Sequence, residues 1–423
     1  MSKTFREWNV EQHWLLPPSV MDFVPADHIA HFIRDTVREQ LDLSAVLAPY
    51  EKEERGYPPY NPVMMTALLL YAYCQGVYSS RRIARGCEER MDFMAVTGLN
   101  RPDFRTVSDF RKRHLEALQD LFEQVLTLCQ HAGIVKLGHV SLDGTKVKAN
   151  ASKHKAMSYE RMHETEKRLK REVREWFRQA KSADEAEDRL HGSTRRGDEM
   201  PGWVADKEQR IAKIREAREA LEAEARAAGK AAVDPKAQRN FTDPESRIMR
   251  KSGKEYVQAY NAQAAVDSTA QVIVAQSLSN NATDVQQLAP TLKQIKQNTG
   301  RQAKEFSADA GYCSEGNLAV LARHHVDSYI ATGRQRHHEA SATGRRRTQG
   351  TRVAAMRTKL ARAGRRSRYR LRKSVVEPVF GQIKHARGFR QFMLRGLEKA
   401  QGEWSLLCTV HNLLKLAKAK KNR

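Results

Sequence analysis

The chain has 423 residues, 40% of them hydrophobic, which is enough for two or three globular domains with buried cores. Lys and Arg total 74 against 50 acidic residues, and the net charge of +24 predicts a polyanionic partner, with nucleic acid the foremost candidate. The most apolar run, residues 64–74, is too short to cross a bilayer and the N-terminus is polar, so we expect a cytosolic protein without a membrane partner.

Residues 1–135 carry the patterns of an all-helical N-terminal domain. Asn61 followed by Pro62 provides an N-cap and a first-turn residue for an apolar helix over residues 63–74. A further helix start is predicted at residues 106–109, ahead of an apolar stripe with three- and four-residue spacing. These patterns predict a helical domain that ends near residue 135.

An arginine-rich stretch, residues 79–114, lies among these helices and includes Arg81 and Arg82. Its short helix and turn signals are compatible with a helix-turn-helix that contacts DNA. Basic helical surfaces are, however, commonly only solvated. The overall charge favours the first alternative, so we expect Arg81 and Arg82 to contact DNA.

Asp143 ends an alternating apolar pattern in which Val140 and Leu142 lie on one side. The pattern predicts a short buried strand that delivers one carboxylate to an edge. A buried carboxylate is costly unless it is paired, hydrogen-bonded or bound to a metal, so an acid at this place requires a partner. The alternative is a structural aspartate that begins an Asx-turn into Gly144.

Residues 158–228 consist mainly of Glu, Lys, Arg and Ala with few apolar anchors, and Gly197 and Pro201 interrupt them. This composition predicts two long polar helices joined by a loop, a helical hairpin inserted at about residues 155–235 into a fold that continues beyond it. The hairpin is either a solvated spacer or an arm that embraces DNA.

Strand patterns return after the insertion. In chain order we predict strands over residues 256–267 and 271–278, a helix over 284–297, a strand ending at Asp309, a helix capped by Ser314 and a strand over 326–333. This is the order of an RNase H-like α/β fold with a mixed sheet, in which the first and fourth strands lie side by side. We therefore expect Asp143 and Asp309 to be neighbours in space.

Residues 333–373 hold fifteen Lys or Arg residues, among them Arg345, Arg346 and Arg347, against a single acid, Glu339. Such a block is usually disordered, because its charges repel one another unless a polyanion is present. We therefore expect this segment to contact DNA phosphates and to become ordered on DNA.

Glu377 and Lys384, seven residues apart, lie together on the flank of an apolar helical face. Ser374 and Glu377 also match a capping box, with Pro378 in the first turn of the helix. Glu377 is thus either a functional acid or a helix cap.

Several motifs occur in a fixed order: NPVMMTALLLYAYC and PDFRTVSDFRKRH near the N-terminus, then SLDGTKVKANAS, YNAQAAVDSTAQVIVAQSLSNNATD, SADAGYCSE and VVEPVFGQIKHARGFRQFMLRG. In these motifs the chain resembles bacterial insertion-sequence transposases of the DDE superfamily, in the branch with an InsH-like N-terminal domain. The similarity covers nearly the whole length. It implies an RNase H-like catalytic domain over residues 136–423 that follows a helical domain for binding the element ends.

The resemblance places the family's three catalytic, metal-binding acids at Asp143, Asp309 and Glu377. Phosphodiester cleavage needs an activated water and a stabilised leaving 3′-oxygen, and two Mg²⁺ or Mn²⁺ ions supply both. Hard cations take oxygen ligands, so Asp143 would bridge the two ions while Asp309 and Glu377 each bind one. The freed 3′-hydroxyl would then attack target DNA, and no protein nucleophile is required.

The family's third motif joins the Glu to an upstream Tyr and Arg and to a Lys seven residues downstream. Lys384 keeps that spacing, while Tyr369 and either Arg372 or Lys373 are displaced by about one residue. With the basic segment 333–373, these residues would clamp double-stranded DNA. The family also implies a homodimer on paired DNA ends, associated with the bacterial nucleoid.

Other candidate ligands are weaker. Asp267 falls at a predicted hairpin turn and Asp284 at a predicted helix start, where a structural acid is ordinary, so both rank below the three acids. The five cysteines form no CxxC pair and support neither a zinc site nor a disulfide framework.

Three functions are compatible with the sequence. The first is an active transposase, and the second is an RNase H-like DNA nuclease that cuts without strand transfer. The third is an inactive, DNA-binding derivative of a transposase. The presence of all three acids disfavours the third.

Overall fold

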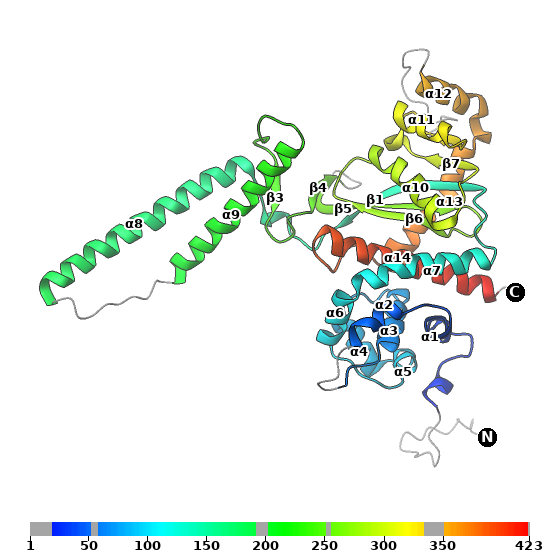
Figure 1. Cartoon of the computed structure of the whole chain (residues 1–423), viewed down its shortest axis with the longest axis horizontal. Helices are drawn as coiled ribbons and strands as arrows, with labels where there is room; N and C mark the ends of the chain where they lie inside the picture. Colours follow the sequence, from blue (N-terminus) through cyan, green and yellow to red (C-terminus); the bar gives the residue numbers. More distant parts are fainter. Residues whose placement is uncertain (1–18, 52–57, 192–201, 251–254, 334–350, 422–423) are drawn as a thin grey trace, which may run out of the picture. The chain divides into compact units, whose positions relative to one another are not determined.

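The computed structural model describes residues 19–51, 58–191, 202–250, 255–333 and 351–421 (Figure 1). Residues 1–128 together with 409–423 form one compact unit, and residues 129–408 form a second. Within the described segments, no helix is both long and apolar enough to cross a membrane.

The first unit is helical throughout its described part. Its elements are η1 (Val20–Phe23), α1 (Ile29–Glu39), α2 (Ser44–Leu47), η2 (Ala48–Tyr50), α3 (Pro62–Cys74), α4 (Ser80–Glu89), α5 (Met91–Thr97), α6 (Phe104–Arg113) and most of α7 (Leu115–His131). As predicted, Asn61 caps α3, because its Oδ1 accepts hydrogen bonds from the N–H groups of Val63 and Met64 at 2.8 and 3.3 Å. Every residue of α3 from Met65 to Cys74 is buried, so this helix is the core of the unit.

The start of α6 differs from the prediction. The helix begins at Phe104 and not at residues 106–109. Asp103 is the N-cap: its Oδ1 accepts hydrogen bonds from the N–H groups of Arg105 and Thr106 at 2.6 and 3.1 Å. This earlier acid satisfies the free N–H groups of the first turn, which leaves Thr106 inside the helix.

The second unit is built on a six-stranded sheet. Its strands are β1 (His139–Lys148), β4 (Arg247–Arg250), β5 (Tyr256–Asp267), β6 (Ile273–Ser279), β7 (Glu305–Ala308) and β8 (Asp327–Ile330). They follow the order β4-β5-β1-β7-β8, with β6 also paired to β5. The strand β5 is antiparallel to β1, β4 and β6, whereas β7 is parallel to β1 and β8. The predicted mixed sheet is confirmed, and so is the pairing of its first and fourth strands.

The position of Asp143 in β1 corrects the sequence interpretation. The predicted short strand ending at an edge is wrong: β1 is central in the sheet and continues through Gly144 to Lys148. It continues because its pairing with β5 extends to Lys148, opposite Ala259. On its other side β7 stops at Ala308, opposite Leu142. Asp143 therefore lies where β1 loses one neighbouring strand, and this frees space beside it.

Helices and single turns complete the second unit. They are η4 (Val285–Gln287), α10 (Leu288–Thr299), η5 (Ala310–Tyr312), α11 (Glu315–Arg323), α12 (Arg352–Ala363), η6 (Gly364–Arg366), η7 (Arg368–Leu371), α13 (Arg372–Gly381), the π-helical turn η8 (Gln382–Ala386) and the first half of α14 (Leu397–Lys421). The helix α10 packs against β6, and α13 packs against β1 and β5. The predicted apolar face of α13 and η8 is buried at Val376, Val379 and Ile383, and it holds this segment against the sheet.

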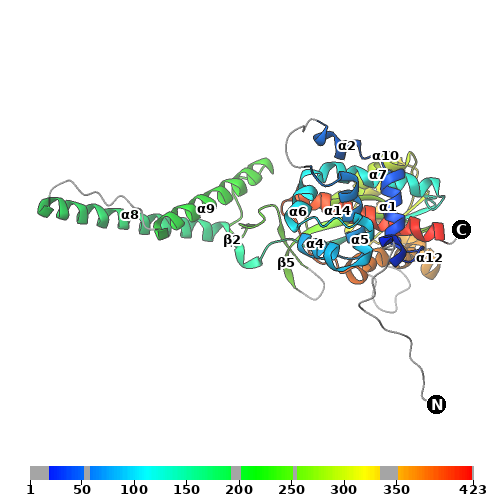
Figure 2. The same ribbon diagram turned by 90° about the horizontal axis from the view of Figure 1, so that it is seen from below.

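A long helical hairpin interrupts the second unit. Figures 1 and 2 show α8 (Tyr159–His191) and α9 (Gly202–Ala227) running side by side. The short strands β2 (Ala156–Ser158) and β3 (Gln238–Asn240) pair at the base of the hairpin. The prediction of two long helices is confirmed. An apolar seam that includes Leu169 and Ile214 holds them together, although the sequence had suggested few apolar anchors.

The basic segment is structured over its described part. Residues 334–350, which include Arg345, Arg346 and Arg347, lie outside the described residues. The expected disorder is wrong for residues 351–373, which form α12, η6, η7 and the start of α13. The carboxylate of Glu315 accepts hydrogen bonds from the N–H groups of Arg352 and Val353 at 3.0 Å each. The Glu315 carboxylate thus satisfies free N–H groups at the start of α12 and lies favourably at the positive end of the helix dipole.

Candidate active site

Asp143 and Asp309 meet at the point where β7 ends. In the parallel register of β1 and β7, Leu142 lies opposite Ala308, so the next residue of each segment is an aspartate. Asp309 is the N-cap of η5, and its Oδ1 accepts a hydrogen bond of 2.9 Å from the Gly311 N–H. The expected proximity of the two acids is confirmed, and it follows from strand pairing alone.

A buried arginine neutralises part of this negative charge. The Arg372 side chain donates from Nη2 to Asp143 Oδ2 at 2.7 Å and from Nη1 to the Tyr369 hydroxyl at 3.2 Å. Only 8% of Arg372 is exposed. The sequence allows either Arg372 or Lys373 at the arginine position of the third motif. The structure turns Arg372 towards the acids and leaves Lys373 exposed on α13.

The positive charge of Arg372 is too little for two carboxylates. Burial raises the pKa of Asp143 to about 6; the attraction of Arg372 opposes this rise and the charge of Asp309 adds to it. Burial also raises the pKa of Asp309, again against the attraction of Arg372. Burial by itself would lower the pKa of Arg372, but the combined attraction of Asp143, Tyr369 and Asp309 outweighs burial and keeps the guanidinium charged. The site therefore has the electrostatic character of one that binds additional cations.

Glu377 is not drawn into this cluster. It is exposed on α13, and among the described residues it makes no hydrogen bond or ion pair. The capping-box alternative is also wrong, because α13 begins at Arg372 and the Ser374 hydroxyl donates backwards to the Leu371 carbonyl at 3.0 Å. Pro378 accordingly lies inside the helix and not in its first turn.

The side chain of Lys384 forms hydrogen bonds with β1. Its ammonium group donates to the Thr145 hydroxyl and, at 2.9 Å, to the Lys146 carbonyl. Both acceptors belong to β1 and lie two and three residues after Asp143. The side chain therefore fastens η8 to the strand that carries the first acid.

The two lower-ranked acids, Asp267 and Asp284, have different surroundings. Asp267 is structural, as expected: its carboxylate accepts hydrogen bonds from the N–H groups of Leu137 and Thr269 at 2.7 and 2.8 Å. Asp284 lies at a helix start, as predicted, because it is the N-cap residue of η4, but its side chain makes no capping hydrogen bond. Its Oδ1 instead accepts a hydrogen bond of 2.6 Å from Asn261, inside the same site as Asp309.

The fit of this site to a divalent cation rests on its donors. In the described part of the chain, no three His, Cys, Asp or Glu side chains already surround one point. The acids that do meet, Asp143 and Asp309, offer only carboxylate oxygens, which Mg²⁺ and Mn²⁺ prefer. The guanidinium of Arg372 already occupies a cation's position against Asp143. The donor chemistry and the excess of negative charge therefore fit such a cation.

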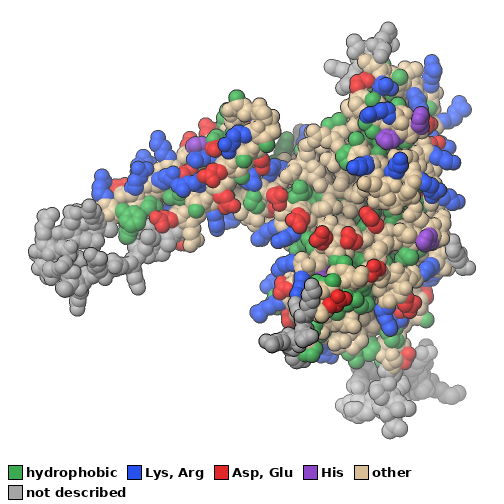
Figure 3. All heavy atoms as spheres, viewed as in Figure 1, with side chains coloured by type: hydrophobic (Ala, Val, Ile, Leu, Met, Phe, Trp, Pro, Cys, Tyr) green, Lys and Arg blue, Asp and Glu red, His purple; other side chains and the backbone are tan. Residues whose placement is uncertain are grey.

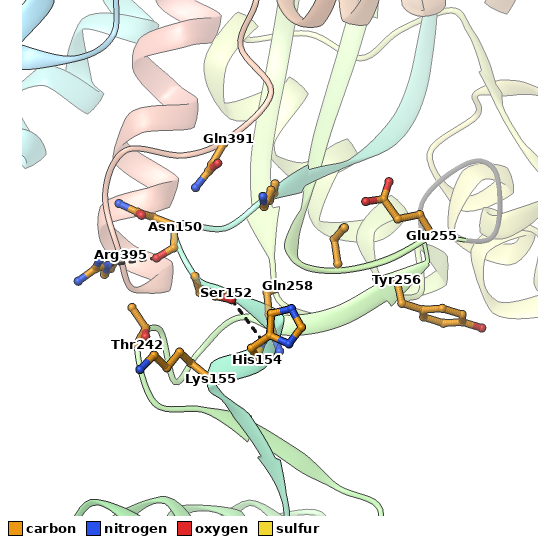
Figure 4. Close-up of a pocket in the computed structure, with 13 residues that line it drawn as sticks. Asn150, Ser152, His154, Lys155, Thr242, Glu255, Tyr256, Gln258, Gln391 and Arg395 are labelled. Carbon is orange, nitrogen blue, oxygen red and sulfur yellow. Dashed lines mark hydrogen bonds between the residues drawn. The ribbon is translucent and has the colours of Figure 1, made fainter.

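A second feature lies at the far end of β1. A cavity of about 530 Å³ is lined by Lys148, His154, Lys155 and Arg395, with Glu255 as the acid among its lining residues (Figure 4). Figure 4 shows that Lys155, Glu255 and Arg395 belong to separate segments of the chain. Arg395 Nε donates a hydrogen bond of 3.1 Å to the Asn150 carbonyl. Among the described residues, Lys155 and Arg395 form no ion pair with an acid. The cavity is therefore a positively charged hollow on the same strand as Asp143.

Basic side chains also lie elsewhere on the described surface. On α12, Arg352 and Arg362 are exposed while Lys359 pairs with Asp327, and on the hairpin basic side chains alternate with acids, as Figure 3 shows. In the first unit Arg81 and Arg82 are exposed on α4, and the Arg81 guanidinium lies 5.1 Å from the ring centre of Phe104. Arg111 is different, because it is buried and donates to the Tyr73 hydroxyl and the Tyr78 carbonyl. The arginine-rich stretch thus includes a core residue that the sequence pattern did not reveal.

Comparison with known protein families identifies two regions. The family model described as transposase domain (DUF772) matches residues 18–113, and the model described as transposase DDE domain matches residues 229–413. The second match includes Asp284, Asp309 and Glu377, whereas Asp143 precedes it. No curated protein sequence matches the chain. The two family matches together cover more than half of the sequence, in the order of the motifs noted above, and the chain belongs to the DDE transposases of insertion sequences.

Proposed function

We propose that this transposase cleaves DNA at the ends of an insertion sequence and joins the freed 3′-hydroxyl to target DNA. The observation that carries the proposal is the meeting of Asp143 and Asp309 at the end of β7 with a single arginine to balance them. Such a pair of carboxylates is suited to hold divalent cations where a phosphodiester is attacked. No nucleophilic side chain is required for this reaction.

Two carboxylates would hold the cations, Mg²⁺ or Mn²⁺. Neighbouring groups of the protein would orient these carboxylates. Bound cations activate a water and stabilise the leaving 3′-oxygen. Arg372 orients the Asp143 carboxylate through the hydrogen bond to Oδ2, and the Gly311 N–H orients that of Asp309. Lys384 fixes β1 just beyond Asp143. These contacts restrict the acids to one geometry before substrate arrives.

Glu377 is proposed as the third acid on the strength of its motif. It lies on α13, five residues after Arg372, and its carboxylate is exposed and without a partner among the described residues. Its role predicts that Glu377→Gln retains folding and DNA binding but loses most Mg²⁺-dependent cleavage. Wild-type cleavage by this variant would remove Glu377 from the catalytic set.

We also propose double-stranded DNA as the partner, bound by a homodimer on paired ends, with α4, the basic segment and the cavity near Lys155 as contact surfaces. The exposed arginines Arg81 and Arg82 would contact the element ends. Exposed Lys373 and the arginines Arg345, Arg346 and Arg347, which lie outside the described residues, would contact phosphates. Crosslinking of purified protein with and without end DNA measures the oligomeric state.

The decisive experiment uses the full chain with end-bearing duplex DNA. Cleavage should require Mg²⁺ or Mn²⁺, and a substrate with a pre-cut 3′ end should be joined to a target plasmid. Cleavage without joining would instead identify an RNase H-like nuclease. DNA binding with neither reaction would identify an inactive derivative and overturn the proposal.

A further inference from the structure

The carboxylate of Asp284 fits into a space left by two glycines that adjoin the catalytic acids. A Cβ atom on Gly144 would lie 2.9 Å from Asp284 Oδ1, and a Cβ atom on Gly311 would lie 3.3 Å from Asp284 Oδ2. Gly144 directly follows Asp143, and Gly311 donates its N–H to Asp309. A Cβ on Gly144 would also meet Gln263 Nε2 at 2.5 Å, and one on Gly311 would also meet Asp309 Oδ1 at 3.0 Å, so Asp284 packs closely against both backbone segments.

One oxygen of Asp284 is held firmly and the other is left available. Oδ1 accepts hydrogen bonds from Asn261 Nδ2 at 2.6 Å, from Gln263 Nε2 at 2.9 Å and from the Lys146 ammonium at 3.3 Å. Within the described residues, Oδ2 accepts no hydrogen bond. A helix cap would have used a backbone N–H of η4, and none is bound. The side chain is therefore oriented towards the acid site and not towards its own helix.

A second polar atom in the same place lacks a partner. Asn261 is fully buried, and its two amide protons are donated to Asp284 Oδ1 and to the Asn281 carbonyl, which fixes the orientation of the amide. Its Oδ1 has no hydrogen-bond partner in the described structure and lies 3.1 Å from the Cβ position of Gly144. A buried carbonyl oxygen without a partner is unusual and indicates a missing donor or cation.

A positively charged side chain of the protein, Lys146, contacts the Asp284 carboxylate. The ammonium group of Lys146 reaches Asp284 Oδ1 from β1, and only 18% of its side chain is exposed. Carboxylate and amide oxygens are the ligands that hard divalent cations take. Asp284 thus has an available oxygen, Oδ2, beside Gly311, while the unsatisfied oxygen of Asn261 lies beside Gly144 and the ammonium of Lys146 contacts Oδ1.

We infer that Asp284 is a further carboxylate ligand of the divalent-cation site, and that Lys146 neutralises it when no divalent cation is bound. The inference rests on the proposed metal-dependent function of Asp143 and Asp309. It adds to the site the acid that precedes η4, which the three-acid motif does not include. It also gives Lys146 a defined role, that of a charge which competes with the cation.

The test measures Mn²⁺ affinity of the purified full-length protein, without DNA, by the electron paramagnetic resonance signal of free Mn²⁺. Asp284→Asn should weaken Mn²⁺ binding by about 10-fold or more, since even supporting residues of metal sites contribute that much. Lys146→Gln should strengthen it, because a competing positive charge is removed. Asp109→Asn, a change of the same charge on exposed α6, should leave it unaltered.

The two variants separate the inference from its simpler alternative. If Asp284 is not a ligand and acts only through its charge, Asp284→Asn should weaken Mn²⁺ binding by no more than Lys146→Gln strengthens it, and such a result would overturn the inference. If Asp284→Asn does not fold, Asp284→Glu keeps the charge but moves the carboxylate oxygens, and it should still weaken Mn²⁺ binding; unaltered binding in this variant would also overturn the inference. Asp143→Asn tests the underlying function: if it leaves Mn²⁺ binding intact, the proposed metal site itself fails. A loss with Asp143→Asn but none with Asp284→Asn rejects only the role of Asp284.

Discussion

Two carboxylates of the second unit, the half-buried Asp143 and the buried Glu166, lie beside basic side chains, but their pKa values shift in opposite directions. Burial raises the pKa of Glu166, but its ion pairs with Lys170, Arg218 and Arg215, at 2.5, 2.7 and 3.5 Å, outweigh burial and lower it. Asp143 has one arginine, which also faces Asp309, and burial raises its pKa to about 6. A surplus of positive charge stabilises a fold, whereas a deficit leaves a carboxylate able to take a cation.

The largest expected effect is on catalysis. Asp143→Asn and Asp309→Asn should each reduce end cleavage by about 1,000-fold or more, and the double variant should be little worse, because residues that act as one unit are not additive. The measurement is the single-turnover rate in Mg²⁺ with saturating protein. DNA affinity should remain near that of the unsubstituted protein, and circular dichroism should show that both variants fold. Retained cleavage in either variant would contradict the assigned site.

Glu166→Gln should have the reverse profile. The substitution leaves three basic groups of the hairpin without their shared carboxylate, at a cost of about 1–3 kcal/mol of stability. Chemical denaturation followed by circular dichroism measures this loss, and the exposed Glu216→Gln on α9 is the matched control. The cleavage rate of the folded protein should be unchanged. A loss of cleavage without a loss of stability would show that the hairpin is not merely structural at this point.

The pH dependence of stability should also differ in sign between these residues. The pKa of Asp143 in the fold, about 6, exceeds its ordinary value of 3.8, so its contribution to stability is lost as pH rises through about 6. The pKa of Glu166 is lowered below 4.5, so its contribution is lost as pH falls through that lowered value. In metal-free protein, Asp143→Asn should therefore lessen the decline of unfolding free energy between pH 4 and 7. Glu166→Gln should lessen the decline on acidification, and identical profiles would refute the contrast.

The smallest expected effect concerns DNA binding. Lys155 and Arg395 line the cavity without an acid partner, whereas Arg168 and Lys207 of the hairpin both pair with Glu172. Replacing Lys155 and Arg395 by Ala should reduce the slope of log affinity against log salt by up to about 1.8, or about 0.9 per phosphate contact. The same double change at Arg168 and Lys207 should alter it less. Equal slopes would show that the cavity does not contact phosphates.

Local patterns were sufficient for the parts of the site that follow from chain order. The alternation before Asp143 and the strand ending at Asp309 predicted two strands, and the parallel pairing of β1 with β7 then brings the acids together. The cap at Asn61 was predictable for the same reason, because both partners lie within three residues.

Structural features that depend on contacts between distant residues could not be predicted from local sequence patterns. The role of Asp284 depends on space above Gly144 and Gly311 and on Asn261, none of which is apparent from its position before a helix. The start of α12 is capped by Glu315, more than thirty residues earlier, and the buried side chains of Val353, Met356 and Leu360 anchor this helix. Charge density predicted disorder there because it counts only local repulsion and omits an acceptor supplied by another helix.

The pairing of β2 with β3 affects how far the hairpin can change in evolution. Ala156 lies opposite Asn240, so the hairpin leaves the second unit and returns to it at adjacent positions. Closing such a gap depends only weakly on the length between its ends, since each doubling of a flexible connection costs about 0.6 kcal/mol. Lengthening, shortening or exchange of α8 and α9 therefore leaves the strands that carry Asp143 and Asp309 in register. Selection can reshape this arm while the chemistry of the sheet stays fixed.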